Sequence, residues 1–348
     1  MNHQLLDNFL LHISDFQKST EDNSTKYYKS SEEHVKKIFY KELKLVCGAS
    51  KSERELLTKF SAELRKVVQD LMIGDDFEKS LSEYSSIESK IEKEVPSNLY
   101  LCAKQIALSA KALYYYKNKN WDKSLAITLE CNALNDYLVQ QGIHSLASRV
   151  FEQNKNISSI FLREQKFDSA YSLLFNLFNY LFNGTNKNLY GNSFNCTSLW
   201  EKTEMLREVY IYQMFIAIVT DTVRFNLYNK DCFLPSKWYL NLNFDVNNTN
   251  RKVISDWIYI NKKLRENNHR KFFISLTNFL SQPISSHYDI LKISLIIELN
   301  KLIQNSGYST KELLLDKISF YLKEKLNGHT RIREVMIKRL NKQVRVGV

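Results

Sequence analysis

Apolar and polar positions follow a helical period along most of this chain. In residues 2–17, apolar side chains recur three and four positions apart, which places them on one face of an α-helix. The same spacing, interrupted by short polar links, predicts helices over 2–17, 31–46, 52–73, 76–94, 99–117, 121–140, 144–164, 167–183, 200–226, 253–266, 269–281, 284–305, 309–326 and 331–345. Ser52 and Glu55 have the spacing of a capping box at the start of the third helix. We therefore expect an all-α protein, with about 70% or more of its residues in helices.

The stretch 167–183 is apolar on nearly every side when it is drawn as a helix. No charged residue occurs between Asp168 and Lys187. A helix of this kind is buried, so we expect it to be the central helix of a helical array. The side chains predicted to form its core are Leu174, Leu177, Phe178 and Leu181.

Residues 227–252 are the least helical part of the chain. Within them, Trp238–Phe244 alternates between apolar and polar positions, which is typical of a strand. A short extended segment or a small β-hairpin is therefore expected near 236–246. Elsewhere the sequence has only 8 Gly and 3 Pro, and this shortage of turn residues favours long helices.

Four regions are expected from these breaks in the pattern. Pro96 marks the first boundary, because proline ends helices or occupies their first turn. The regions are an N-terminal helical region at 1–95, a helical core at 96–226, an irregular loop at 227–252 and a basic helical region at 253–348.

Two segments of the predicted core are similar to each other. Tyr115–Leu125 reads YYKNKNWDKSL, and Phe161–Tyr171 reads FLREQKFDSAY. Each has an aromatic residue, a short polar link, and then an aromatic residue, Asp and a small residue. The small residues are Ser124 and Ala170, three positions after Trp121 and Phe167.

This pattern resembles the tetratricopeptide repeat, in which two helices meet at a polar link and a small residue lets them approach. The resemblance covers residues 99–183 and implies stacked helix hairpins that bind a protein or peptide. Two features depart from the family. The copies lie 46 residues apart, whereas the family period is about 34, and Ala112 and Ser158 replace the usual glycine. An irregular array of generic antiparallel hairpins is the alternative.

The composition bounds the class of protein. No two of the five cysteines lie within four residues of each other, so no zinc motif or disulfide framework is indicated. The N-terminus lacks the basic start and continuous apolar run of a signal peptide. The longest apolar stretches, 171–182 and 209–220, fall short of the roughly 20 residues that cross a bilayer. We expect a cytoplasmic protein without a membrane span.

Catalytic and metal-binding signatures are absent from the sequence. It contains no HExxH or HxxxH spacing, no GxSxG or GxGxxG and no Walker loop. We therefore expect no catalytic residues, no metal and no cofactor. An enzyme whose site is assembled from distant residues stays open as a third class.

Charge is distributed unevenly along the chain. The formal net charge is −3 over residues 1–100, +3 over 101–250 and +11 over 251–348. The last predicted helix is strongly basic, and we expect it to provide the partner-binding residues, namely Arg331, Arg333, Lys338, Arg339, Lys342 and Arg345. A solvated helix face is the alternative interpretation of this charge.

Two function classes follow from these patterns. The first is a non-enzymatic helical-repeat scaffold that binds a protein or peptide partner. The alternative is a nucleic-acid-associated protein that binds through its basic C-terminal helices. If the basic face does not bind, the expected site is the groove of the 99–183 hairpins, along Tyr115, Lys119 and Lys155.

Overall fold

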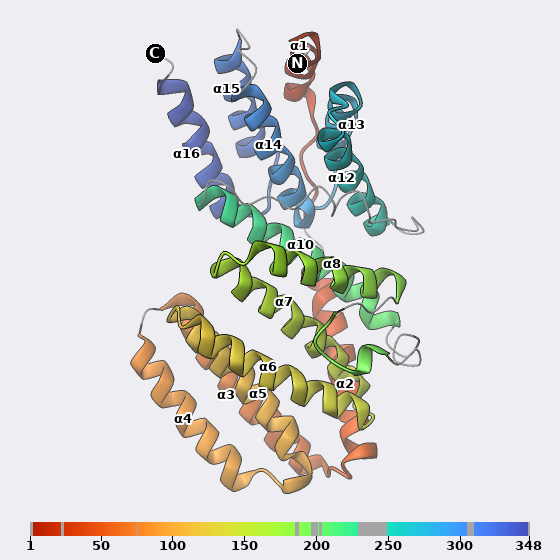
Figure 1. Cartoon of the computed structure of the whole chain (residues 1–348), viewed down its shortest axis with the longest axis vertical. Helices are drawn as coiled ribbons and strands as arrows, with labels where there is room; N and C mark the ends of the chain where they lie inside the picture. Colours follow the sequence, from red (N-terminus) through yellow and green to blue (C-terminus); the bar gives the residue numbers. More distant parts are fainter. Residues whose placement is uncertain are drawn as a thin grey trace. The chain divides into compact units, whose positions relative to one another are not determined.

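The computed structural model of this protein is all-α (Figure 1). It describes residues 3–21, 24–74, 76–184, 188–195, 201, 204–228, 249–304 and 310–346. Over these residues it is 85% helical, with 14 α-helices and no strand. This confirms the all-α prediction. The hairpin expected near 236–246 lies outside the described residues.

The backbone divides into two compact units. Unit 1 combines Met1–Tyr28 with Tyr212–Val348, and unit 2 is Lys29–Ile211. In sequence, unit 2 is thus an insertion between the two segments of unit 1. These boundaries differ from the four regions expected from the sequence, since the first residues of the chain join the C-terminal part.

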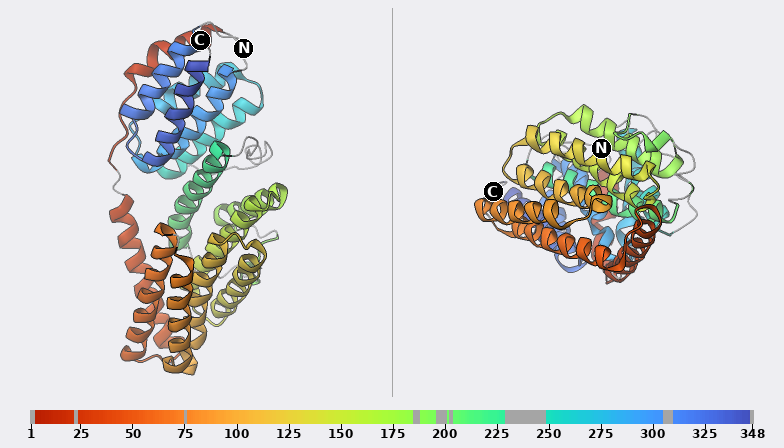
Figure 2. Two further views of the ribbon diagram at one scale, coloured as in Figure 1. Left: turned by 90° about the vertical axis from the view of Figure 1, so that its left-hand side faces the viewer. Right: turned by 90° about the horizontal axis from the view of Figure 1, so that it is seen from below.

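Unit 2 is a succession of helices that pack on their neighbours (Figure 2). They are α2 (Ser24–Val46), which begins in unit 1, α3 (Lys51–Ile73), α4 (Phe77–Glu94), α5 (Ser97–Lys117), α6 (Trp121–Gln140), α7 (Ala147–Arg163) and α8 (Phe167–Asn183). Each helix from α3 to α8 contacts the next one, and α3 also packs on α5. A short 3-10 helix, η2 (His144–Leu146), precedes α7.

Helix α8 is buried as predicted. Leu174, Leu177, Phe178 and Leu181 are all at most 1% exposed. Next to them, the ring of Phe194 packs 4.7 Å from Tyr180 between centroids, so residues after α8 fold back on its buried face. The prediction of a buried helix is confirmed, and within unit 2 this helix is the last of the succession and packs mainly on α7.

The start of α3 corrects one local prediction. Its capping box is formed by Ser50 and Glu53 instead of Ser52 and Glu55. The Glu53 N–H donates to Ser50 Oγ at 3.3 Å, and the Ser50 N–H donates to Glu53 Oε2 at 2.7 Å. The two candidate pairs have the same spacing. Because the helix begins at Lys51, its N-cap residue is Ser50, and the capping box is therefore Ser50–Glu53.

Three helix–helix links that have a non-glycine residue at positive φ share one geometry. Lys119, Gln165 and Asn267 are all left-handed, with φ of 58°, 62° and 54°. In each link this residue donates its N–H to the carbonyl three positions back, and the next N–H reaches the carbonyl five positions back. These are the two hydrogen bonds of a Schellman motif, which satisfies the last carbonyls of a helix. The link at Asn267 is a third copy that the sequence comparison did not include.

The hairpin links bring small residues together as well. Ser124 Oγ donates to the carbonyl of Ala112 at 3.0 Å, which joins α6 to α5. Ser158 and Ala170, the corresponding residues of the next hairpin, are 1% and 0% exposed.

Unit 1 contains the remaining helices. They are α1 (His3–His12), α10 (Glu204–Tyr228), which begins in unit 2, α12 (Thr249–Arg265), α13 (His269–Ser281), α14 (Asp289–Gln304), α15 (Lys311–Glu324) and α16 (Thr330–Val346). Helix α1 packs on α13, α12 packs on α13, and α15 packs on both α14 and α16.

The carboxylate of Asp289, at the start of α14, joins distant segments of unit 1. Its Oδ2 accepts hydrogen bonds from Ser19 Oγ at 3.1 Å and from the N–H groups of Asn327 and Gly328 at 2.9 and 2.7 Å. The N–H of Ser19 in turn donates to the carbonyl of Lys325 at 2.8 Å. Residues near the N-terminus are thereby fixed to the link between α15 and α16.

Lys292, one turn after Asp289, is fully buried. Its Nζ donates to the carbonyls of Leu280 and Gln282 at 3.2 and 2.7 Å, at the end of α13. Burial lowers the pKa of Lys292 to about 8, while the nearby Asp289 carboxylate acts in the opposite direction. The ammonium therefore satisfies helix-end carbonyls that would otherwise lack donors.

Replacing Leu177 with Asp should give insoluble or unfolded protein, because a carboxylate at this fully buried position has no partner. Ser172→Asp, on the exposed side of the same helix, should change the unfolding free energy by no more than about 0.5 kcal/mol. Thermal unfolding followed by circular dichroism measures both variants. A Leu177→Asp protein with the parent's melting temperature would contradict the assignment of α8 to the core.

Gly328→Ala should destabilise unit 1 by about 3 kcal/mol. A Cβ at Gly328 would lie 2.2 Å from the backbone carbonyl oxygen of Ser286, and backbone atoms cannot move aside cheaply. The comparison variant is Gly48→Ala. At Gly48, φ is +65° and nothing lies within 4 Å of an added Cβ, so this variant should lose only about 1 kcal/mol through backbone strain. Urea unfolding of the two variants compares these costs, and equal losses would be inconsistent with a steric role for Gly328.

Candidate binding groove

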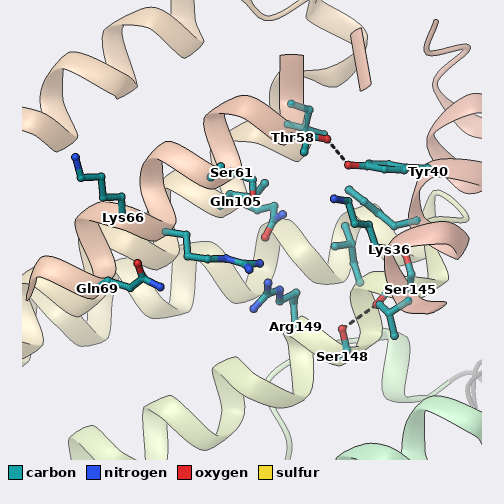
Figure 3. A pocket seen from close by; sticks show the side chains of 17 residues that line it. Lys36, Tyr40, Thr58, Ser61, Lys66, Gln69, Gln105, Ser145, Ser148 and Arg149 are labelled. Carbon is teal, nitrogen blue, oxygen red and sulfur yellow. Dashed lines mark hydrogen bonds between the residues drawn. The ribbon is translucent and has the colours of Figure 1, made fainter. Parts of the chain in front are cut away.

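A groove of about 330 Å³ opens in unit 2, between α2, α3, α5 and the η2–α7 segment (Figure 3). Helices α3, α5 and α7 are alternate members of the stack, and α2 supplies one further wall. The lining residues are Val35, Lys36, Phe39, Tyr40, Leu57, Thr58, Ser61, Ala62, Arg65, Lys66, Gln69, Gln105, Ile106, Ser145, Leu146, Ser148 and Arg149.

The amphipathic pattern of α3 explains how one helix provides so much of this lining. Its buried residues, which include Phe60, Leu64 and Val67, recur three and four positions apart. Ser61, Arg65 and Gln69 repeat every four positions between them. Since a helix turns about 100° per residue, these residues form a second face, which is polar and faces the groove.

The floor of the groove is neutral and polar. Gln105, Ser145 and Ser148 are between 2% and 3% exposed. Gln105 Nε2 donates to the carbonyl of Cys102 at 3.2 Å, and Ser148 Oγ donates to the carbonyl of Ser145 at 2.9 Å. Ser145 donates both its N–H, at 3.1 Å, and its hydroxyl, at 2.5 Å, to Glu42 Oε2. These bonds fix the orientation of the floor.

The rim of the groove is cationic. Lys36, Arg65, Lys66 and Arg149 all line it and are exposed. Arg149 forms an ion pair with Glu152 at 2.5 Å, which holds its guanidinium near the opening. The Lys36 ammonium lies 5.5 Å from the ring centroid of Tyr40, a cation–π distance.

Tyr40 links two walls of the groove. Its hydroxyl forms a hydrogen bond with Thr58 Oγ1, so α2 is joined to α3 (Figure 3). Thr58 Oγ1 also donates to the carbonyl of Arg54 at 2.8 Å. Both residues of this polar pair line the groove.

The chemistry available in the groove is binding of an anionic group. Among the 17 described residues that line it there is no carboxylate, imidazole or thiol. General acid–base chemistry near neutral pH uses such groups most often. Lysine and arginine side chains instead pair with carboxylates or phosphates.

Within the described ranges, no group of three or more His, Cys, Asp or Glu side chains is placed to hold a metal ion. None of the helices that the structure describes is long and apolar enough to cross a membrane.

The six basic residues predicted to bind a partner all belong to α16 in unit 1. Arg331 and Lys338 are exposed, whereas Arg339 is half-buried. The side chains of Lys342 and Arg345 lie outside the part of the chain that the structure describes. The structure therefore places these residues on one helix of unit 1, and none of them is among the residues that line the groove.

Arg333 has a structural role within this set. Its Nη1 donates to the carbonyls of Leu322 at 3.1 Å, Lys323 at 3.4 Å and Leu326, all at the end of α15. Its Nη2 donates to Thr330 Oγ1 at 3.2 Å. A guanidinium in this position caps the C-terminus of α15, where cations also interact favourably with the helix dipole.

The second set of expected groove residues does not line the groove. Tyr115 lies beneath the Lys123 ammonium, 5.4 Å from its ring centroid. Lys119 is the left-handed residue of a helix link, and Lys155 accepts hydrogen bonds from two serines through its carbonyl. None of the three is among the lining residues.

The groove residues Lys36, Arg65, Lys66 and Arg149 were not predicted from the sequence. They lie in a part of the chain whose net charge is low, and Arg149 is more than 80 positions from Lys66. The one local signal is the polar face of α3. Comparison with known proteins adds nothing to it, because no family model, no curated protein and no solved structure matches this chain.

Arg333→Gln should lower the unfolding free energy by about 2 kcal/mol, since it removes several charge-assisted hydrogen bonds to helix-end carbonyls. Arg331→Gln removes the same charge from an exposed position two residues away and should change stability by no more than about 0.5 kcal/mol. Urea unfolding measures the pair. If both variants lost the same stability, Arg333 would have no special capping role.

Proposed function

We propose that this protein is a non-enzymatic helical scaffold whose unit 2 groove binds an acidic segment of a partner protein. One observation carries the proposal: Lys36, Arg65, Lys66 and Arg149 surround a neutral floor, with no carboxylate among the described lining residues. A segment rich in Asp or Glu complements this arrangement, since complementary charge guides association and selects partners.

The dimensions of the groove favour a short segment. A volume of about 330 Å³ is at the lower end of the range for ligand pockets, roughly 300 to 1,000 Å³. A few side chains fill such a space, whereas a folded domain does not enter it. Apolar lining from Phe39, Leu57 and Leu146 would accept an apolar side chain next to the acidic ones.

The arrangement of unit 2 supports the likeness to tetratricopeptide repeats over residues 99–183. Alternate helices α3, α5 and α7 contribute to one groove, which is where stacked helix pairs bind their partners. The contact between Ser124 and Ala112 brings α5 and α6 together at the expected small residues.

We place the protein in the cytoplasm. Cys47, Cys102 and Cys131 are free thiols, which is usual in reducing compartments.

Charge reversal at the rim tests the groove. The probes are fluorescein-labelled twelve-residue peptides that contain Asp and Glu, each matched with a peptide in which Asn and Gln replace them. The acidic peptides should bind at least about tenfold more tightly than their neutral counterparts. The double variant Lys36→Glu/Lys66→Glu should bind the acidic peptides about tenfold or more weakly than the parent, since each exposed ion pair contributes up to about 1 kcal/mol. Fluorescence anisotropy measures both effects.

The control for this test comes from the same two helices. Lys44→Glu/Lys59→Glu makes the same change in net charge at exposed positions that do not line the groove. It should leave peptide affinity within about twofold of the parent if rim charges act mainly at short range. Equal losses in the two variants, or equal binding of acidic and neutral peptides, would refute the proposal.

A further inference from the structure

The excess positive charge belongs mostly to unit 1. Of the formal net charge of +11, unit 1 carries +9 and unit 2 carries +2. Part of the charge in unit 1 is used internally, as Arg333 and Lys292 show. Further cations lie near the end of α12 and the start of α13, on α14 and on α16, and several of them form ion pairs.

The first cluster of cations surrounds Glu298 on α14. Arg265 Nη2 lies 3.0 Å from Glu298 Oε2, and Lys301 Nζ lies 3.1 Å from Glu298 Oε1. The pKa of Lys301 is lowered by burial first and then by the charges of Arg265 and Arg339, while Glu298 raises it. Glu298 is therefore shared by cations from two helices, and the charge of Arg339 on α16 acts on the same group of side chains.

The second cluster surrounds Glu266, the residue after Arg265. Its carboxylate pairs with Lys263 at 2.6 Å. The pKa of Glu266 is lowered by this hydrogen bond first and then by the charges of Lys263, Lys262 and Lys271. The same ratio, one carboxylate to three cations, thus occurs twice in adjacent parts of unit 1.

An exposed aromatic ring lies between these cations on α12. Tyr259 is 43% exposed, and the Lys263 ammonium lies 5.1 Å from its ring centroid. At about 100° per residue, Arg265, Lys262, Tyr259 and Lys263 follow one another around the helix within about 160°. The aromatic ring and the cations therefore share one face, in which Glu266 falls between Lys262 and Tyr259.

We propose that this face of unit 1, formed by α12, α13, α14 and α16, binds single-stranded nucleic acid. Phosphates would pair with Arg265, Lys301 and Arg339 at one end and with Lys262 and Lys271 at the other. A base would stack on Tyr259. Cationic grooves with an aromatic stacking platform bind single strands without sequence preference.

Tyr259 is the feature that selects nucleic acid over other anions. Carboxylates and lipid phosphates pair with cations, but only a nucleic acid carries a flat base next to every phosphate, ready to stack on an exposed tyrosine. The inference is independent of the unit 2 groove, because none of these residues lines that groove.

The test is fluorescence anisotropy with fluorescein-labelled U20 RNA and the full chain, in 50 to 200 mM KCl. Binding should weaken steeply with salt, as expected for counterion release. Two double variants should each reduce the slope of log affinity against log salt by about 1.4, or about 0.7 per lost phosphate contact. They are Lys301→Gln/Arg339→Gln and Lys262→Gln/Lys271→Gln. Tyr259→Ala should weaken binding about tenfold at every salt concentration, whereas Tyr259→Phe should stay within about twofold of the parent.

The controls separate this face from general charge effects and from the groove. Lys90→Gln/Lys93→Gln removes two exposed cations from α4 in unit 2 and should leave the slope unchanged, as should Lys36→Glu/Lys66→Glu. Circular dichroism and thermal unfolding confirm that each variant is folded. Failure of the parent to bind U20 at 50 mM KCl, or equal slope losses in the α4 control, would overturn the inference. So would binding to phosphatidylserine vesicles in the absence of U20 binding.

Discussion

Unit 1 depends on one buried carboxylate that takes donors from both ends of the chain. Asp289 Oδ2 accepts a hydroxyl from Ser19 and two backbone N–H groups from Asn327 and Gly328. Burying a carboxylate is costly unless donors replace its water, and here the donors come from segments about 300 residues apart in sequence. The same contact explains why Met1–Tyr28 belongs with the C-terminal helices.

Periodicity predicted the helices well because their buried faces repeat every three to four residues, and α8 is the clearest example. It did not predict the attachment of residues 19–20, which form hydrogen bonds to Lys325 and Ile284. Such bonds use backbone groups, which every residue has, so the sequence carries no distinct signal for them. The capping box shows a similar limit, since Ser50–Glu53 and Ser52–Glu55 have equal spacing and packing decides between them.

The binding residues were harder to predict than the helices, because the role of a cation depends on what surrounds it. Arg331 and Arg333 are two positions apart on one basic helix, yet only Arg333 reaches the carbonyls that end α15. Arg265 and Lys301 were not singled out from the sequence, although they share Glu298 across two helices. Side chains brought together by tertiary packing leave no local pattern.

Net charge along the sequence also misrepresents the groove. Residues 1–100 sum to −3, yet they supply Lys36, Arg65 and Lys66 to a cationic rim. The acidic residues of this stretch are not among the lining residues: α4 carries exposed Glu78, Glu92 and Glu94, and Glu42 acts only as the acceptor for Ser145 of the floor. Since exposed charges separated by more than about 10 Å are largely screened at physiological salt, a ligand in the groove responds mainly to the rim. Because the acidic side chains of α2, α3 and α4 lie outside the lining, the rim of the groove is positive in a region whose net charge is negative.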